Sequence, residues 1–374
     1  MGDTFPTIRL AAVQAAPVLL DREATIAKAC HLIRETGASG ADVIGFPEGF
    51  VPAHPVWFHF HPATSPAAMA LSRELFANAV VVPSPATDAL AAAARDANAY
   101  VVVGICEKEA TSAGTMYNSL LVIGRTGEIL GVRRKLVPTV GERIVHSAGS
   151  GDSVRVFPAD FGALSGLMCG ENSNPLLTYT MSALGAKVHV AAWPSFFNPG
   201  VDMWAIADVA CRAIAYQNSA FVISAIGGID DRMVERVTAT EDDRAYLRAA
   251  GARGGTAIYA PGGTLLAGPL GGGEGILYAE ADLERIVPRK IVHDYAGDYN
   301  RFDIFQLLVN VSPAGPPIRI VPDERETGEA SGLLAGPRVP IRVGPPRRLW
   351  IGEPLDAASV PEAQGGRGDE GSPG

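Results

Sequence analysis

Short apolar runs rich in β-branched residues alternate with longer stretches of helical periodicity, and this alternation restricts the possible folds more than any other feature of the chain. We predict strands at residues 8–14, 42–46, 100–106, 117–124, 128–134, 164–169, 187–192, 220–225, 256–260 and 264–267. Helices are predicted at residues 21–36, 86–98, 175–184 and 202–218, the first capped by Asp21. Strands and helices mixed in this order are typical of a layered α/β fold, in which helices cover a mixed sheet.

Composition and charge exclude several classes of protein. The 374 residues are 47% hydrophobic and 19% charged, so the chain can bury a sizeable core and is neither wholly disordered nor fibrous. A net charge of -9 provides no basic field for phosphate backbones, and we expect no nucleic-acid partner. No apolar run approaches the roughly 18 residues that span a bilayer, and the first residues do not resemble a signal peptide. We therefore predict a cytoplasmic protein with no membrane partner.

The organisation of the chain changes near residue 310. Proline and glycine are strongly enriched in residues 311–374, and these residues interrupt regular secondary structure. We predict one domain over residues 1–310 and a Pro/Gly-rich, partly disordered C-terminal tail over residues 311–374.

Three residues that can carry chemistry stand at or near the ends of predicted strands, where layered α/β folds expose side chains to a crevice: Glu48, Lys135 and Cys169. Gly170 follows the cysteine and allows a sharp turn, after which backbone amides could face a developing anion. A desolvated Glu48 could take the thiol proton, and Lys135 could hold charge that develops on a substrate. Taken singly, each residue is explained at least as well as a buried thiol, a capping or surface carboxylate, and a surface cation.

The other cysteines, Cys30, Cys106 and Cys211, lie inside apolar or helical patterns and are expected to be core residues. The four cysteines form no CxxC pattern, so we predict reduced thiols and neither a disulfide framework nor a zinc site. His59 and His61 are close enough to suggest a metal pair, but no partner cluster accompanies them, and we interpret them as residues of a solvated loop.

Taken together, three segments resemble the nitrilase, or carbon–nitrogen hydrolase, superfamily, and most closely its nitrilase branch. They are Phe46-Pro47-Glu48-Gly49-Phe50, Arg134-Lys135-Leu136-Val137-Pro138-Thr139 and Met168-Cys169-Gly170-Glu171-Asn172. They occur in the family's order and at similar separations, and the resemblance extends from about residue 8 to residue 310.

The resemblance implies a four-layer α-β-β-α sandwich with Cys169 as nucleophile, Glu48 as general base and Lys135 as stabiliser of the intermediate. Glu142 matches the family's second glutamate, which positions the substrate and the lysine or assists proton transfer. From residue chemistry alone, an ion pair of Glu142 with Arg143 or Lys135 is an equal alternative. No metal and no organic cofactor is implied.

The implied reaction converts an organic nitrile to the carboxylic acid and ammonia through a thioimidate and an acyl-enzyme. Hydrolysis of amides, or hydration of nitriles to amides, remains the alternative. The intact Glu48, Lys135 and Cys169 disfavour a non-catalytic interaction module.

One departure from the family's signature concerns the substrate pocket. Gly170 and Asn172 stand where the signature has tryptophan and histidine. We predict substrate-binding positions at Trp57, Gly170, Asn172, Trp193 and Phe197, although loop packing or subunit contacts would explain the aromatic residues equally well.

The apolar residues of helix 202–218 cover more than one core-facing stripe, which indicates burial on two sides. The family pairs subunits through outer helices and often extends into spirals. We therefore predict a homo-oligomer that is based on a dimer and possibly spiral.

Overall fold

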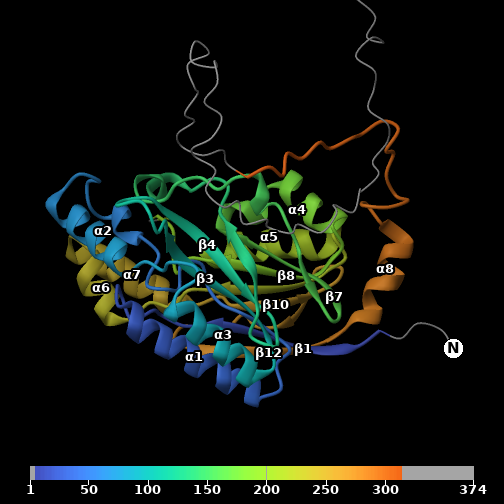
Figure 1. Ribbon diagram of the computed structural model, residues 1–374, viewed down its shortest axis with the longest axis horizontal. Helices are drawn as coiled ribbons and strands as arrows, with labels where there is room; N and C mark the ends of the chain where they lie inside the picture. Colours follow the sequence, from blue (N-terminus) through green and yellow to red (C-terminus); the bar gives the residue numbers. More distant parts are fainter. Residues whose placement is uncertain (1–4, 199, 314–374) are drawn as a thin grey trace, which may run out of the picture. The chain divides into compact units, whose positions relative to one another are not determined.

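Two sheets packed face to face form the centre of the protein. The computed structural model describes residues 5–198 and 200–313. Each sheet has six strands, in the orders β12-β1-β2-β3-β4-β5 and β11-β10-β9-β8-β7-β6. Helices lie on the outer face of each sheet (Figure 1). The predicted four-layer α-β-β-α sandwich is therefore confirmed.

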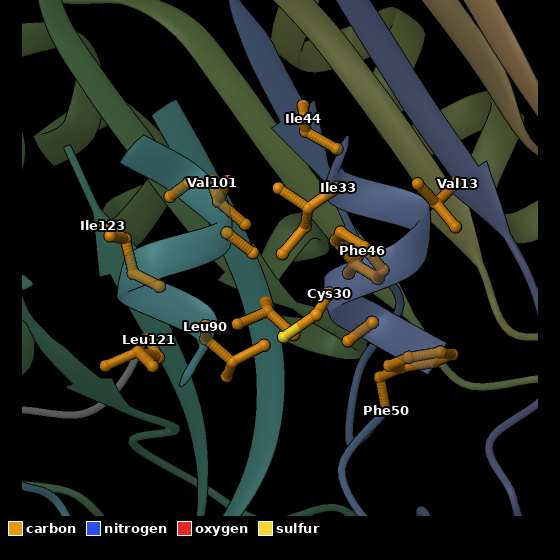
Figure 2. Close-up of a cluster of buried hydrophobic side chains, with 14 of the residues drawn as sticks. Val13, Cys30, Ile33, Ile44, Phe46, Phe50, Leu90, Val101, Leu121 and Ile123 are labelled. Carbon is orange, nitrogen blue, oxygen red and sulfur yellow. The ribbon is translucent and has the colours of Figure 1, made fainter. Parts of the chain in front are cut away.

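The first sheet combines parallel and antiparallel pairs. Its strands are β1 (Thr7–Gln14), β2 (Val43–Gly45), β3 (Tyr100–Lys108), β4 (Met116–Ile123), β5 (Ile129–Arg134) and β12 (Gly275–Asp282). β1, β2 and β3 run parallel, whereas β4, β5 and β12 pair antiparallel with their neighbours. Helices α1 (Arg22–Ala38) and α3 (Pro85–Ala97) cover its outer face with buried apolar side chains (Figure 2). As predicted, Asp21 caps α1 and accepts a hydrogen bond from Ala24 N.

The second sheet carries the other pair of helices. Its strands are β6 (Phe157–Ala159), β7 (Gly162–Met168), β8 (Ala186–Trp193), β9 (Phe221–Ile226), β10 (Ala257–Ala260) and β11 (Thr264–Ala267). Helices α4 (Pro175–Ala183) and α5 (Met203–Gln217) pack on its outer face. Along β8, Val188 and Val190 point into the core between the sheets, while Ala191 and Trp193 point toward α5, which is the alternation expected of a strand.

Glycines set the close packing of the two sheets. A Cβ added to Gly45 would lie 2.8 Å from Ile223 Cγ2, and one added to Gly166 would lie 2.9 Å from Leu120 Cδ1. Both distances are shorter than a normal contact, so a larger residue would require these side chains to move within the packed core. The residues that follow β2 reach the second sheet directly, since Glu48 N donates to Trp193 O at the end of β8.

A smaller apolar cluster lies outside the sandwich. Helices α2 (Pro66–Asn78), α6 (Asp231–Val237) and α7 (Glu241–Arg253) contribute to it together with the 3-10 helix η1 (Val56–His59). The sequence analysis assigned no element to α2, α6 or α7, and it also missed β6, β12 and α8 (Ile286–His293). The charged segment that forms α6 and α7 has few buried residues, with Leu247 alone buried in α7, so its periodicity is weak.

Two further findings concern the predicted boundaries and partners. The predicted tail over residues 311–374 lies outside the described residues from residue 314 onward. Within the described part of the chain, no helix combines the length and the apolar character that crossing a membrane requires.

Candidate active site

Glu48 lies in a tight loop that a glycine on the neighbouring strand makes possible. It follows β2 and is only 2% exposed. A Cβ on Gly104 of β3 would collide with Pro47 O and would come within 2.5 Å of Gly49 N. Gly49 itself has a φ of 58°, a conformation that glycine adopts at low cost. The local sequence therefore fixes the carboxyl group of Glu48 beside the sheet.

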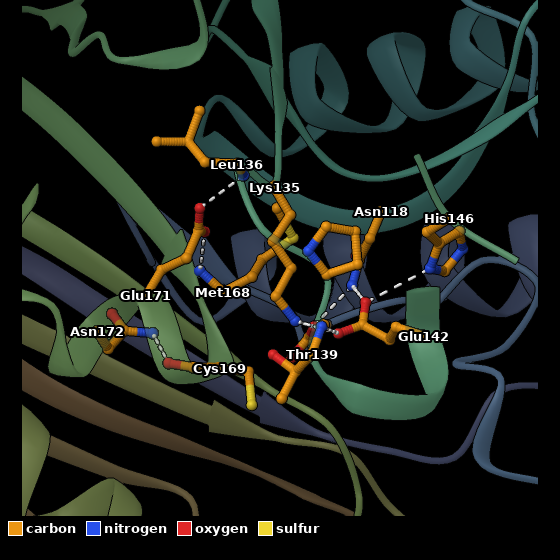
Figure 3. A network of polar contacts seen from close by, with 12 residues as sticks. Asn118, Lys135, Leu136, Thr139, Glu142, His146, Met168, Cys169, Glu171 and Asn172 are labelled. Carbon is orange, nitrogen blue, oxygen red and sulfur yellow. Dashed lines mark hydrogen bonds and ion pairs between the residues drawn. The ribbon is translucent and has the colours of Figure 1, made fainter. Parts of the chain in front are cut away.

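Lys135 is the first residue after β5 and joins two glutamates. Its Nζ donates to Glu48 Oε1 at 2.7 Å. It also donates to Glu142 Oε2 at 2.5 Å (Figure 3). Asn118 on β4 donates from Nδ2 to Glu48 Oε1 and to Glu142 Oε1, each at 2.6 Å. All four residues are buried. The structure thus brings Glu48, Lys135 and Glu142 together, and it adds Asn118, which the sequence analysis did not single out.

The environments of the two glutamates differ in the number of hydrogen bonds they receive. Glu142 lies in the 3-10 helix η2 (Val140–Ile144) and accepts from Lys135, Asn118, Thr139 N and His146. Burial alone would raise the pKa of Glu142, but the hydrogen bond from His146 and the charge of Lys135 lower it well below the usual value. Glu142 is therefore ionised.

The pKa of Glu48 is shifted in the opposite direction, upward. Its Oε1 accepts two hydrogen bonds, whereas its Oε2 has no partner within residues 5–198 and 200–313. Burial raises the pKa of Glu48 to about 7, although the charge of Lys135 opposes the shift. Two neighbouring carboxyl groups with separated pKa values suit different roles, one as a fixed anion and one as a group that exchanges a proton near neutral pH.

The charge between the carboxylates belongs to Lys135. Burial would lower the pKa of this ammonium, but Glu48 and Glu142 raise it above its ordinary value. Ligand atoms of Glu48, His54 and Glu142 lie within 4.8 Å of one another, a spacing that metal ligands also show. Both carboxylates of this group, however, already contact a cation, the ammonium of Lys135. Of the two ion pairs considered for Glu142, the one with Lys135 forms, whereas Arg143 Nε donates to Pro138 O.

Cys169 begins the turn that follows β7. The strand ends at Met168, one residue earlier than predicted, and Cys169 opens the 3-10 helix η4 (Cys169–Ser173) with a φ of 47°. The side chain is largely buried, with 8% exposed. Burial and the negative charge of Glu48 raise the pKa of the thiol to about 12, although Lys135 opposes the shift. The resting thiol is therefore protonated and needs a base before it can react.

A buried ion pair ties this turn to the first sheet. Arg133 of β5 donates from Nη1 and Nη2 to Glu171 Oε2 and Oε1 at 2.5 and 2.8 Å. The same carboxylate accepts from Met168 N and from Leu136 N. Glu171 therefore links the turn of Cys169 to the segment that carries Lys135 (Figure 3).

The predicted substrate-binding aromatic residues fall into two groups. Trp193 shares a buried cluster with Cys169, and Phe197 packs against that cluster. Trp57 is fully buried in the separate cluster of α2, where its Nε1 donates to Ser72 Oγ. The ring of His59 contacts the ring of Phe197 with centroids 5.3 Å apart, so the two aromatic loops meet.

Gly170 and Asn172, the positions that depart from the family's signature, have different surroundings. Gly170 is exposed, and an added Cβ would meet only Thr139 Oγ1, at 3.9 Å. Asn172 is buried and donates from Nδ2 to Cys169 O at 3.1 Å (Figure 3). Its Oδ1 lies 2.9 Å from Nε2 of His189 on β8, a residue that the sequence analysis did not identify.

Comparison with known proteins points to one family. A model of the carbon–nitrogen hydrolase family matches residues 9–290. The chain is similar to a nitrilase of Pseudomonas syringae pv. syringae (strain B728a), with 36% identity over 338 residues, 87% of this chain and 96% of that protein. It is also similar to an aliphatic nitrilase of Rhodococcus rhodochrous, with 34% identity over 323 residues, 85% of this chain and 83% of that protein.

A solved structure agrees in fold. The Saccharomyces cerevisiae protein described as a member of branch 10 of the nitrilase superfamily superposes with a TM-score of 0.59 at 19% identity. The match covers 76% of this chain and 94% of that chain. At this identity the likeness concerns the arrangement of the sheets and helices.

Proposed function

The chain belongs to the carbon–nitrogen hydrolase family, in its nitrilase branch, and on this premise we propose that it hydrolyses an organic nitrile to the carboxylic acid and ammonia. The resemblance noted in the sequence is confirmed by these relatives. One observation supports the chemistry above the others. Two buried glutamates, one with a raised and one with a lowered pKa, both contact the ammonium of Lys135, and the thiol of Cys169 nearby is protonated.

The first step of the proposed reaction is attack by sulfur. The Cys169 thiol transfers its proton to Glu48, whose free Oε2 and pKa of about 7 suit a base that works near neutral pH. The sulfur forms a bond to the nitrile carbon as one carbon–nitrogen π bond breaks, and Glu48 passes the proton that it took from the thiol to the nitrile nitrogen, which gives a thioimidate and leaves Glu48 ionised. The raised pKa of the thiol disfavours a free thiolate, so we propose that proton removal and attack proceed together. A thiol of raised pKa is a strong nucleophile once its proton is removed.

Lys135 and Glu142 have supporting roles in this proposal. A nitrile is a poor electrophile until its nitrogen can accept charge, and the ammonium of Lys135 provides a cation for that purpose. Glu142 stays ionised and holds Lys135 in place through the 2.5 Å hydrogen bond. Substitution of Lys135 therefore removes the cation that faces the nitrile nitrogen, and substitution of Glu142 displaces it.

Two waters complete the hydrolysis. Water activated by Glu48 adds to the thioimidate carbon, ammonia leaves, and a thioester remains. A second water attacks the thioester, the carbon–sulfur bond breaks, and the acid and the thiol are released. A cavity of about 10 Å³ lined by Glu48, His54 and Ser195 has the volume for about one water molecule beside the proposed base.

Ammonia release from aliphatic, aryl and arylacetic nitriles and from the corresponding amides tests this function. We expect turnover of nitriles, with acid as product, and loss of turnover in Cys169→Ala. Cys30→Ala is the matched control, because Cys30 is a free, buried cysteine in the cluster between α1 and α3. Turnover of amides alone would contradict the proposed substrate, and nitrile turnover that survives Cys169→Ala would contradict the proposed nucleophile.

We also propose that the enzyme is a homo-oligomer built on a dimer that pairs through the outer helices. Ile206 and Val209 of α5 and Leu176 of α4 are exposed, and Val209 is 70% exposed. Ile206 and Val209 line a groove of about 530 Å³ along α5. Exposed apolar residues gathered on one face are typical of protein contacts. Small-angle scattering should therefore give a dimer or larger for the native chain and a smaller species for Val209→Asp. A monomeric native chain would refute the proposal.

A further inference from the structure

A buried polar chain runs from the nucleophile's backbone into the second sheet. Asn172 Nδ2 donates to Cys169 O at 3.1 Å, Asn172 Oδ1 lies 2.9 Å from His189 Nε2, and His189 Nδ1 lies 2.8 Å from Ser165 Oγ. Ser165 belongs to β7 and His189 to the adjacent β8. The side chains of all three polar residues are buried.

The chemistry of the groups fixes the direction of each hydrogen bond. The amide nitrogen of Asn172 is its only donor, and it faces the carbonyl of Cys169, so Oδ1 must accept from His189 Nε2–H. His189 then has a bare Nδ1, which accepts from the hydroxyl of Ser165. Burial lowers the pKa of His189 to about 3, which agrees with a neutral ring. The chain therefore has one consistent arrangement of protons.

The carbonyl at the end of this chain belongs to a strained residue. Cys169 has a φ of 47°, in a region that residues with a Cβ rarely occupy. Such a conformation persists when surrounding contacts hold it. On one side, Glu171 binds Met168 N, the amide before the turn. On the other, Asn172 binds the carbonyl of Cys169 itself.

We propose that Asn172, oriented by His189, is a positioning residue that holds the backbone of Cys169 so that its sulfur faces Glu48 and Lys135. This role, which rests on the proposed function, differs from the substrate contact that the sequence suggests for Asn172. Both polar ends of its side chain are used by the protein, one by the nucleophile's carbonyl and one by His189. Cys169 O can only accept, so it faces the amide nitrogen of Asn172, and His189 Nε2–H holds the amide oxygen on the other side.

Asn172→Asp tests the positioning role, because aspartate has the same size but cannot donate to Cys169 O when ionised. Two quantities are measured at pH 8 on the full chain: kcat and KM for a hydrolysed nitrile, and the rate at which iodoacetamide alkylates Cys169, followed by mass spectrometry. We expect kcat and the alkylation rate each to fall by about 10²-fold, with KM nearly unchanged, because misplacement of a reacting group by about 1 Å has an effect of this size. Asn218→Asp makes the same change at a buried asparagine that donates to Thr178 O, and it should leave both rates unchanged.

His189 provides a second, independent test should Asn172→Asp fail to fold. Glutamine can donate to Asn172 and accept from Ser165, whereas leucine can do neither. We therefore expect His189→Gln to keep most of the kcat and the alkylation rate, and His189→Leu to lose both. Equal rates in the two variants would overturn the role of His189.

The outcomes separate this inference from the proposed function. A rise in KM at unchanged kcat in Asn172→Asp would show a substrate contact and overturn the positioning role, as would an unchanged alkylation rate. Alkylation of Cys169 is read without nitrile turnover. It therefore decides the role of Asn172 even if Cys169→Ala still hydrolyses nitriles and the proposed function fails.

Discussion

Removal of the charge on Glu171 should destabilise the fold more than any surface substitution of the same kind. The side chain of Arg133 is fully buried and that of Glu171 is 6% exposed, and the two form a bidentate pair. Glu171→Gln leaves a guanidinium without a counter-charge in the interior. Breaking a buried pair in this way costs about 3–5 kcal/mol of unfolding free energy.

The backbone contacts of Glu171 determine how the cost is shared between the two partners. Met168 N and Leu136 N donate to different oxygens of the carboxylate. A glutamine has only one side-chain oxygen that can accept these hydrogen bonds. In Arg133→Met the carboxylate keeps both backbone donors, so we expect a smaller cost of about 2–3 kcal/mol. The double variant should cost clearly less than the sum of the two, because it leaves no unpaired guanidinium.

Urea unfolding followed by circular dichroism, at one fixed protein concentration, measures these free energies. Asp96→Asn is the matched control, since Asp96 pairs with Arg34 at 3.0 Å but both side chains are about half exposed. We expect this control to change stability by under about 1 kcal/mol. A cost for Glu171→Gln as small as that of the control, or strict additivity in the double variant, would refute the reasoning.

Three further predictions concern the site. If Glu48 is the base, kcat/KM should fall about tenfold per pH unit below pH 7, because a carboxyl with a pKa of about 7 is increasingly protonated there; a profile flat from pH 8 to 5 would contradict it. His146→Leu removes a hydrogen-bond donor to Glu142 and should raise the pKa of that glutamate. The acid side of the pH profile of kcat/KM should then fall by more than tenfold per pH unit, because two carboxylates are protonated there. Gly104→Ala should lower ammonia release at least about tenfold by displacing the Glu48 loop, whereas Gly114→Ala, where nothing lies within 4 Å of an added Cβ, should not; equal rates would reject this account.

Much of the fold is predictable from the sequence because its strands and helices have strong local signals. The two sheets contain all the strands that the alternation of apolar residues predicts, and Asp21 caps α1 as expected. The position of Glu48 and Lys135 after strands makes them candidates for a crevice, and the resemblance of their segments to the family implies that they meet, as they do. Two of the elements that the sequence analysis missed, α7 and α8, have at most one buried residue each, and the periodicity of α7 is weak.

The supporting residues of the site escape prediction for a different reason. Asn118 is a polar residue inside an apolar strand, and His189 is another, so each is visible in the sequence as an interruption. Their partners, however, come from distant segments, Glu48 for Asn118 and Asn172 for His189. Which buried polar groups pair depends on the register and the packing of the sheets, which one sequence does not specify.

The candidate nucleophile follows a strand of the second sheet, whereas the lysine and both glutamates are held by the first. The thickness of the core between the sheets therefore sets the distance between the sulfur and the ammonium, and the rate constant depends on that distance. Leu120 and Ile223 belong to this core, and a Cβ added to Gly45 would lie 2.8 Å from Ile223 Cγ2. A directed-evolution library restricted to such positions would change the relative placement of sulfur and ammonium, and with it the partition between acid and amide products, while every residue that touches the nitrile stays native.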